Sequence, residues 1–317
     1  MNEQDKPNQE NWERGVLEKL AMSAVQEQRR TRHWSILFKT LGFIYLFIVL
    51  FLAAGWFGSD GVSLPKEHTA LVDLQGVISA NDTSADSIIA SLQGAFEDKK
   101  TKGVILRINS PGGSPVQAGQ IYDEIKRLRG LHPNIPLYAV VDDICASGGY
   151  YVAAGADKIF VDKASIIGSI GVLMDGFGFT QTMEKLGVER RLLTAGENKG
   201  FLDPFSPVDP KQQVFAKQML EEIHGQFINV VREGRGKRLK ETPEMFSGLV
   251  WSGEKSIQLG LSDGLGNVES VARDVIKAKD IVDYTKQDSL AERLVGRLGV
   301  SMGKAMAPFE KAGIVLR

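Results

Sequence analysis

Residues 104–115 read VILRINSPGGSP, a run of branched apolar residues that ends in a turn rich in Gly and Pro. The segment 104–108 has the length and composition of a buried strand. The two glycines let the backbone turn sharply at the carboxyl end of that strand and point N–H groups into a crevice. Because ligands of open α/β sheets favour that edge, the stretch predicts a strand and one wall of a site. A plain strand-to-helix turn is the alternative interpretation.

The flanking sequence continues as an alternation of strands and helices, with apolar residues recurring every three or four positions in the helices. The predicted strands span 69–74, 104–108, 137–141 and 158–161, and the predicted helices lie around 88–96, 116–128 and 148–155. Asp209 and Pro210 are typical of an N-cap and a first helical position, so a long helix is expected to start there. The alternation favours parallel strands joined by crossover helices, which is an α/β fold.

The composition is that of a globular protein. The 317 residues are 43% apolar and 24% charged, with a net charge of −1. A near-neutral charge implies no general attraction to nucleic acid. The single cysteine, Cys145, excludes an intramolecular disulfide and a multi-cysteine metal site, and the four histidines lack ligand spacing. We therefore expect no metal, no cofactor and no nucleic-acid partner.

One long apolar segment lies near the N-terminus. The stretch from Thr40 to Phe57 contains no charged residue, and a helix of that length spans roughly 27 Å, close to the thickness of a bilayer core. Arg29, Arg30 and Arg32 precede it, so the positive-inside rule predicts a cytoplasmic N-terminus. A cleaved signal peptide and a buried core helix are the alternatives, and the long N-terminal extension counts against the first.

These features predict five parts of the chain. They are a cytoplasmic tail over 1–38, a transmembrane signal-anchor helix over 39–58, a stalk over 59–67, one α/β domain over 68–283 and a C-terminal tail over 284–317. Leu290, Leu294 and Leu298 recur at every fourth position of the last part, which fits an amphipathic helix or a partly disordered tail.

Two further turns are rich in Gly and Ser. In ASGGY (146–150), Ser147 precedes an apolar helix whose first amides are free, so it is placed to act as a nucleophile, with the amide of Gly148 beside an oxyanion. Serine is also a favoured N-cap, and the spacing alone weighs the two interpretations equally. The other turn, GSIGV (168–172), fits a β-turn or a bulge.

A nucleophilic serine needs a base. None of the histidines lies in a turn that resembles a site, and His224 falls within the predicted long helix. A lysine can take the role where burial lowers its pKa toward neutrality. The residues alone leave four candidates open, each by default a solvated lysine: Lys158, Lys163, Lys185 and the glycine-flanked Lys199.

Five ordered motifs together resemble one family: NSPGGSP, ASGGYY, ASIIGSIGV, a glycine-flanked lysine at 199, and SGLVWSGEKSIQLGLSDGLG. Over about 65–275 the chain is similar to the short, single-repeat form of the bacterial signal peptide peptidase A (SppA) family, or protease IV. The resemblance implies a ClpP/crotonase-like fold and a membrane-anchored serine peptidase with a Ser/Lys dyad.

The resemblance also implies roles for the matching residues. Ser147 matches the nucleophile, Lys199 the general base, and Ser169 the serine that orients the lysine. Gly113 and Gly148 match the positions whose amides form the oxyanion hole, with the glycine before Gly113 as an alternative to it.

The family cleaves remnant signal peptides and other hydrophobic peptides outside the cytoplasmic membrane, as ring-like homo-oligomers. The resemblance therefore implies a bacterial inner-membrane protein with a periplasmic catalytic domain, and a dyad shared between subunits. Three other functions stay open. They are an acyl-CoA enzyme of the crotonase type, a catalytically inactive scaffold, and a cysteine peptidase using Cys145.

Overall fold

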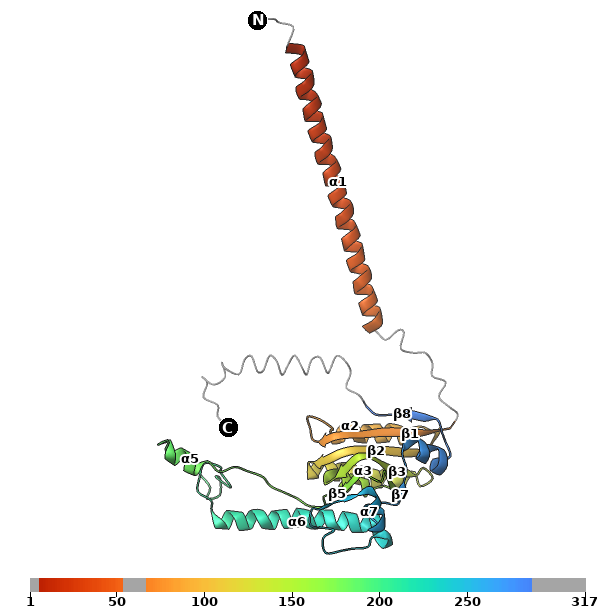
Figure 1. Cartoon of the computed structure of the whole chain (residues 1–317), viewed down its shortest axis with the longest axis vertical. Helices are drawn as coiled ribbons and strands as arrows, with labels where there is room; N and C mark the ends of the chain where they lie inside the picture. Colours follow the sequence, from red (N-terminus) through yellow and green to blue (C-terminus); the bar gives the residue numbers. More distant parts are fainter. Residues whose placement is uncertain (1–5, 54–66, 287–317) are drawn as a thin grey trace. The chain divides into compact units, whose positions relative to one another are not determined.

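A computed structural model of the chain describes residues 6–53 and 67–286 (Figure 1). The chain divides into two units, residues 1–64 and 65–317, and each is described by itself. The predicted stalk up to residue 66, the end of the predicted anchor and the leucine-rich part of the predicted C-terminal tail lie outside the described residues.

The described part of the first unit is one helix, α1 (Lys6–Ala53). Its stretch Gln28–Leu50 is long and apolar enough to cross a membrane, and none of it is buried. Large side chains such as Phe38, Phe43 and Phe47 are exposed, which counts against a buried core helix. The helix also extends through most of the predicted cytoplasmic tail, where the polar, mixed-charge sequence led to no helix prediction.

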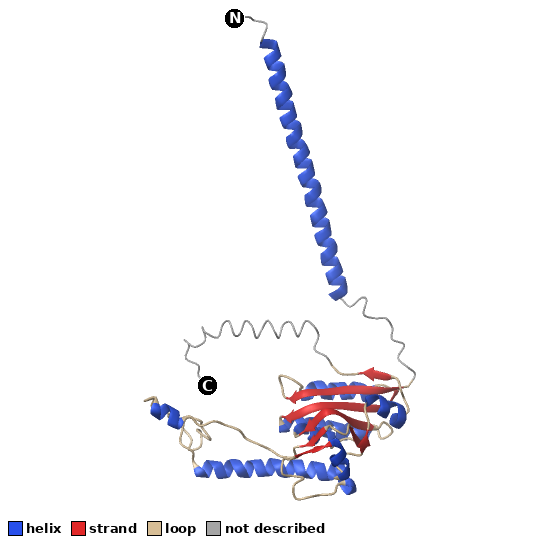
Figure 2. Cartoon of the chain, viewed as in Figure 1, coloured by secondary structure: helices blue, strands red, loops and turns tan. Residues whose placement is uncertain are grey.

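The second unit is built on a sheet, whose strands are red in Figure 2. The sheet has eight strands in the order β6-β5-β3-β2-β1-β8, and β4 pairs with β3 and β7. The strands are β1 (His68–Ile78), β2 (Thr101–Gly113), β3 (Leu137–Ala146), β4 (Lys158–Val161), β5 (Ile166–Gly168), β6 (Val250–Ser252), β7 (Gly264–Leu265) and β8 (Ile281–Asp283). Every pair is parallel except β5 with β6. The predicted α/β fold with parallel strands is confirmed.

Several helices of this unit begin at residues whose side chains cap them. The helices are α2 (Ala85–Glu97), α3 (Pro115–Leu131), α4 (Gly148–Ala153), α5 (Thr180–Lys185), α6 (Pro210–Arg235), α7 (Gly253–Gln258) and α8 (Val268–Ser270), with a 3₁₀ turn η1 (Gly236–Arg238) and a π turn η2 (Val271–Ile276). Ser84 and Ser114 accept from backbone N–H groups at the starts of α2 and α3. Asp209 caps α6 and Pro210 is its first residue, as predicted.

The two faces of the sheet bury separate apolar clusters, as alternating side chains of a strand require. On one face, Leu106 and Ile108 pack with Ile121 of α3, Tyr150 of α4 and Phe227 of α6. On the other face, a smaller cluster joins the sheet to α8 and η2; it contains Leu71, Ile105, Val140, Phe160, Val268 and Val271. The two layers hold the carboxyl ends of β2, β3 and β5 side by side at one edge.

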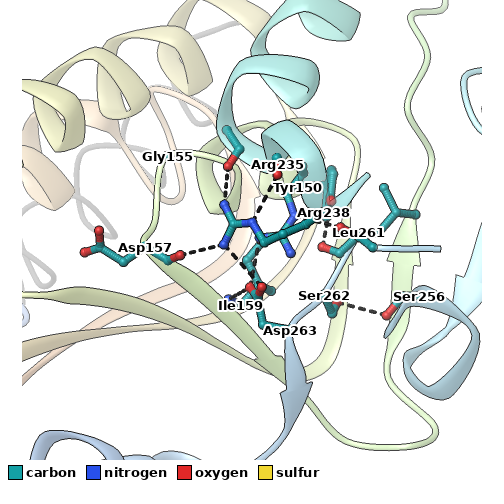
Figure 3. Close-up of polar contacts among 12 residues, drawn as sticks. Tyr150, Gly155, Asp157, Ile159, Arg235, Arg238, Ser256, Leu261, Ser262 and Asp263 are labelled. Atoms are coloured by element: carbon teal, nitrogen blue, oxygen red, sulfur yellow. Dashed lines mark hydrogen bonds and ion pairs between the residues drawn. The ribbon is translucent and has the colours of Figure 1, made fainter. Parts of the chain in front are cut away.

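A buried ion pair fixes the C-terminal end of α6 (Figure 3). Arg235 is 1% exposed; its Nε donates to the carbonyl of Gly260 and its Nη1 to Asp263 Oδ2, both at 2.9 Å. Burial acts to raise the pKa of Asp263, but the hydrogen bond and charge of Arg235 outweigh it and hold that pKa below its usual value. Tyr150 donates to the carbonyl of Leu261 at 2.7 Å, so the same region supports α4.

Between β5 and α6 the chain makes a long excursion over residues 171–209, here called the arm. Within the arm, α5 is the one regular helix. In Figure 1, α6 runs past the edge of the sheet toward α5. Leu173 and Leu193 are 82% and 96% exposed, so the arm presents large apolar side chains to its surroundings.

The compact unit extends a little beyond the predicted boundary at 283. The backbone N–H of Tyr284 donates to Leu71 O at 2.8 Å, and its hydroxyl donates to Asp98 Oδ2 at 2.6 Å. This hydrogen bond is the main reason why the pKa of Asp98 lies below its usual value. The described contacts continue to Lys286, whose N–H donates to Ser91 Oγ.

Candidate active site

Three turns that are far apart in sequence meet at one edge of the sheet. Strands β2, β3 and β5 are neighbours, and the turns NSPGGSP, ASGGY and GSIGV lie at their carboxyl ends. The register pairs Ala146 with Gly168 and Ser110 with Cys145, so the strand ends are level. The site predicted at this edge is therefore assembled by the sheet itself.

Ser147 occupies the N-cap position of α4, but it does not act as a capping residue. Its side chain makes no capping hydrogen bond, and its backbone has φ 49° and ψ −122°. A non-glycine residue in such a conformation costs of order 1–3 kcal/mol and persists only where its surroundings impose it. Its Oγ is therefore not used by the helix. Of the two interpretations left open by the spacing, the capping one is wrong.

Two glycine amides lie close to Ser147. A Cβ placed on Gly148 would lie 3.2 Å from the amide nitrogen of Gly113, so the backbones of these two glycines approach closely in the pocket that Ser147 lines. The preceding glycine, Gly112, is a poorer candidate for an oxyanion donor, because its N–H already donates to Ser110 Oγ at 3.1 Å. A side chain at Gly112 would also lie 2.7 Å from the Cβ of Ser147, which explains why glycine is needed there.

Ser169 begins the turn after β5 and faces the same pocket as Ser147. Its φ is 50°, another positive value for a non-glycine residue. Its N–H donates to Leu249 O at 2.8 Å, and the carbonyl of Gly168 beside it accepts from the N–H of Ser147 at 2.9 Å. These bonds determine the position of Ser169 next to the candidate nucleophile.

A pocket of about 600 Å³ lies over these residues. The candidate site residues Gly113, Ser147, Gly148 and Ser169 line one part of it. The rest of the lining is mainly apolar and comes from α4, α6, the start of the arm, the prolines of the NSPGGSP turn and residues 247–248. It includes Tyr151, Val172, Leu173, Ile223 and Phe227. The aromatic rings of Tyr151 and Phe227 contact each other with centroids 5.1 Å apart. Such a wall suits an apolar side chain.

Lys199 does not line this pocket. It lies in a turn of the arm with an exposed side chain, and its N–H donates to Gly196 O at 3.1 Å. The next residues contact the first turns of α6, since the N–H of Leu202 donates to Gln212 Oε1 at 2.9 Å. Ile223, which does line the pocket, is about three helical turns or roughly 16 Å further along α6. Within one chain, the structure brings four of the five site residues together and leaves Lys199 apart.

The other candidate bases and nucleophiles lie elsewhere. Neither a lysine nor a histidine is among the described residues that line the pocket. His224 of α6 is paired with the carbonyl of Ile170 at 3.2 Å. Cys145 is fully buried and burial raises the pKa of its thiol, so the cysteine peptidase alternative is wrong. No group of three or more His, Cys, Asp or Glu in the described segments has the geometry to hold a metal ion.

Two family profiles match the chain. That of Peptidase family S49 matches residues 130–282 and that of Clp protease matches residues 68–167. The two matches cover the sheet, and the first also contains Ser147, Ser169 and Lys199. The Clp protease match agrees with the observed α/β architecture, so the predicted fold class is confirmed.

Several curated proteins are similar to this chain. A Brucella abortus protein named Na(+)/H(+) antiporter NhaA is 41% identical over 243 residues, which are 74% of this chain and 32% of that protein. A putative signal peptide peptidase SppA of Enterococcus faecium is 32% identical over 199 residues, 63% of this chain and 57% of that protein. A putative protease of Methanocaldococcus jannaschii is 30% identical over 237 residues, 73% of this chain and 75% of that protein.

The chain thus spans about a third of the Brucella protein and somewhat more than half of the Enterococcus protein. The archaeal relative is matched over three quarters of its length. Together with the profile match and the arrangement of Ser147 beside two glycine amides, these similarities show that the chain belongs to peptidase family S49.

Proposed function

We propose that this protein is a membrane-anchored serine endopeptidase that uses a Ser147/Lys199 dyad. The observation that carries the proposal is the backbone of Ser147, which is held at φ 49° without a capping bond in a pocket beside the amides of Gly113 and Gly148. Membership of family S49 and relatives named as proteases support a peptidase over an acyl-CoA enzyme.

The proposed reaction has two steps. Neutral Lys199 accepts the proton of Ser147 while Oγ attacks the peptide carbonyl carbon, and the amides of Gly113 and Gly148 stabilise the oxyanion. The resulting lysine ammonium, oriented by Ser169, protonates the leaving amine as the C–N bond breaks. Water then loses a proton to Lys199 and attacks the ester carbonyl carbon. The lysine ammonium returns that proton to Ser147 Oγ as the C–O bond breaks, which releases the acid product and regenerates Ser147 and neutral Lys199.

The base is proposed to come from a neighbouring copy of the chain. The separation of Lys199 from the pocket within one chain supports this arrangement, as do the exposed apolar side chains of the arm. In a closed ring, each arm would lie on the next subunit and deliver its lysine there, which is a heterologous interface. Burial of Phe177 and Leu193 would drive the docking.

The proposed substrates are hydrophobic peptides, such as remnant signal peptides. An apolar pocket wall of Tyr151, Leu173 and Phe227 beside Ser147 supports the binding of an apolar side chain next to the scissile bond. An extended peptide would add its backbone to a strand edge and place alternate side chains in pockets. The putative signal peptide peptidase of Enterococcus faecium is a relative whose name agrees with this class.

The proposed location is the bacterial inner membrane. The apolar stretch of α1 supports a single crossing, and Arg29, Arg30 and Arg32 support a cytoplasmic N-terminus. The catalytic domain would then lie on the periplasmic side, close to peptides left in the membrane.

The test compares Ser147→Ala and Lys199→Ala with the unmodified full-length protein on a hydrophobic fluorogenic peptide. We expect each substitution to lower the turnover number by at least about 1000-fold, as for other nucleophile and base deletions. Lys185→Ala is the matched control, because Lys185 also lies in the arm, in α5, and should leave turnover unchanged. Full activity of both site variants would refute the dyad. No turnover of any peptide and no labelling of Ser147 by a serine-reactive probe would support the scaffold alternative.

A further inference from the structure

The edge strand β6 supports the strand end that holds the candidate nucleophile. Strand β5 lies between β3 and β6: on one side Gly168 pairs with Ala146, and on the other side Gly168 pairs with Val250. Trp251 of β6 pairs with Ile167 in the antiparallel ladder. The sequence singled out this region only as part of a family motif, and the reaction proposed above makes no use of it.

The indole of Trp251 packs directly on Gly168. A Cβ added to Gly168 would lie 3.0 Å from Trp251 Cδ1, 3.4 Å from its Nε1 and 3.1 Å from Leu249 O. The φ of Gly168 is 112°, in the region that favours glycine. The ring therefore covers the backbone of Gly168, and it also packs against the main apolar cluster.

Gly168 and Ser169 are the two residues that join β5 to the site. The carbonyl of Gly168 accepts from the N–H of Ser147 at 2.9 Å, and the N–H of Ser169 donates to Leu249 O at 2.8 Å. A shift of Gly168 would move the strained Ser147 turn and Ser169 together. On the side of this segment that faces β6, the Trp251 ring packs against Gly168 together with the carbonyl of Leu249.

We propose that Trp251 is a positioning residue for the reaction. By holding Gly168 and Ser169 in place, its ring keeps Ser147 in the orientation in which Oγ can attack. This inference rests on the proposed role of Ser147. The indole N–H is buried and has no hydrogen-bond partner among the described residues, so the ring surface of Trp251, and not its polar group, does the positioning. Phenylalanine is therefore the conservative substitute.

The first test measures acylation. Full-length protein, Trp251→Phe and Trp251→Leu are reacted with a fluorophosphonate probe, and the second-order rate of labelling at Ser147 is determined. We expect Trp251→Leu to label roughly 10- to 100-fold more slowly, with a fall in peptide kcat but less than about a threefold change in KM, and Trp251→Phe to recover most of the rate. Phe160→Leu is the control, because it removes a ring from the apolar cluster on the opposite face of the sheet.

The second test leaves Trp251 intact and so does not depend on the folding of a Trp251 variant. The chain contains four tryptophans, and the other three, Trp12, Trp34 and Trp56, precede the α/β unit and can be replaced by Phe. Labelling of Ser147 should then change the emission spectrum of Trp251, and the change should be absent in Ser147→Ala.

The outcomes separate this inference from the proposed function. Labelling of Ser147 at the unmodified rate in Trp251→Leu, or an unchanged Trp251 emission after complete labelling, would overturn the positioning role alone. If Phe160→Leu were labelled as slowly as Trp251→Leu, the positioning role would be overturned as well, because the effect would then reflect a general loss of packing. Equal labelling of the unmodified protein and Ser147→Ala would overturn the proposed function, and this inference with it.

Discussion

The backbone N–H of Ser147 donates a 2.9 Å hydrogen bond to the carbonyl oxygen of Gly168. This bond joins the turn that carries the candidate nucleophile to the strand end that carries Ser169. With the close approach of Gly112 to Ser147, it holds three short motifs that are separate in the sequence side by side across β2, β3 and β5.

Replacement of Gly168 by alanine should displace the strand end that contacts Ser147 and carries Ser169. The new Cβ would meet Trp251 and Leu249 O in a conformation, φ 112°, that side chains rarely adopt. We expect a stability loss of about 1–3 kcal/mol and a fall in kcat of about tenfold or more. Gly119→Ala is the control: Gly119 lies within α3 with open space around its Cα, so alanine should be neutral or stabilising there. Equal kinetics of both variants would contradict the link between Gly168 and Ser147.

The strained backbone of Ser147 predicts that glycine at this position stabilises the fold, although the variant loses the nucleophile. Ser147→Gly should be more stable than Ser147→Ala by about 1 kcal/mol in the free energy of unfolding, because glycine adopts φ 49° without strain. It should therefore unfold at a higher temperature. Both variants should be inactive since both lack the hydroxyl. Thermal unfolding followed by circular dichroism compares the two. An alanine variant as stable as the glycine variant would show that the turn is not strained.

The proposed lysine base predicts a rate that rises toward alkaline pH. A lysine accepts a proton only in its neutral form, and that form grows as the pH increases. The measurement is kcat/KM for a peptide without titratable groups, at pH values where the protein stays folded. A rate that is flat between about pH 5 and about pH 10 would argue against a lysine base.

A dyad shared between subunits predicts complementation. Ser147→Ala and Lys199→Ala are each inactive, but a co-assembled mixture contains interfaces with an intact serine on one chain and an intact lysine on the next. With equal, random mixing, roughly a quarter of the interfaces are complete, so roughly a quarter of the activity should return. Mixing the same variants after each has been cross-linked into its own assembly is the control and should restore nothing. Absence of recovery in freely mixed subunits would favour a dyad within one chain.

The buried pair of Arg235 and Asp263 predicts how stability depends on pH. Because the pKa of Asp263 is lowered in the folded state, its contribution is complete above its unfolded pKa and is lost as the pH falls through the lowered value. Asp263→Asn should cost about 3–5 kcal/mol at neutral pH, since it leaves the charge of Arg235 buried without a counter-charge. This cost should shrink in acid, where the unmodified protein loses the pair as well.

Urea unfolding at a series of pH values measures this dependence. Asp274→Asn is the comparison, because Asp274 pairs with Arg273 on the surface, where such pairs contribute little. If the two variants had the same cost at neutral pH, the pair in Figure 3 would not anchor α6.

The sequence predicted the elements of the fold that are long enough to show a pattern of apolar residues or a capping motif. Apolar periodicity located α2 and α3, the apolar run 104–108 located the middle of β2, and the Asp209–Pro210 pair located the first turn of α6. The strands β5, β6 and β8 were missed because each has three residues, too few to show a period. Their pairing comes from contacts between distant segments, such as Gly168 with Val250.

The candidate site was predictable to a similar degree. Ser147 could be found because a serine between a strand and a glycine-rich helix start is conspicuous, but its strained backbone could not be foreseen from spacing. The pocket wall was missed, since Tyr151 and Phe227 belong to different helices and meet only in the folded chain. Lys199 was suggested by family resemblance, because no local pattern distinguishes a base from a solvated lysine.

Covalent labelling with a serine-reactive probe identifies the nucleophile. The full-length protein is labelled with a fluorophosphonate probe, digested, and the modified residue is identified by mass spectrometry. Our account predicts a single modified residue, Ser147, and no modification of the Ser147→Ala variant under the same conditions. Peptide cleavage that persists in Ser147→Ala, with the probe on another residue, would contradict it.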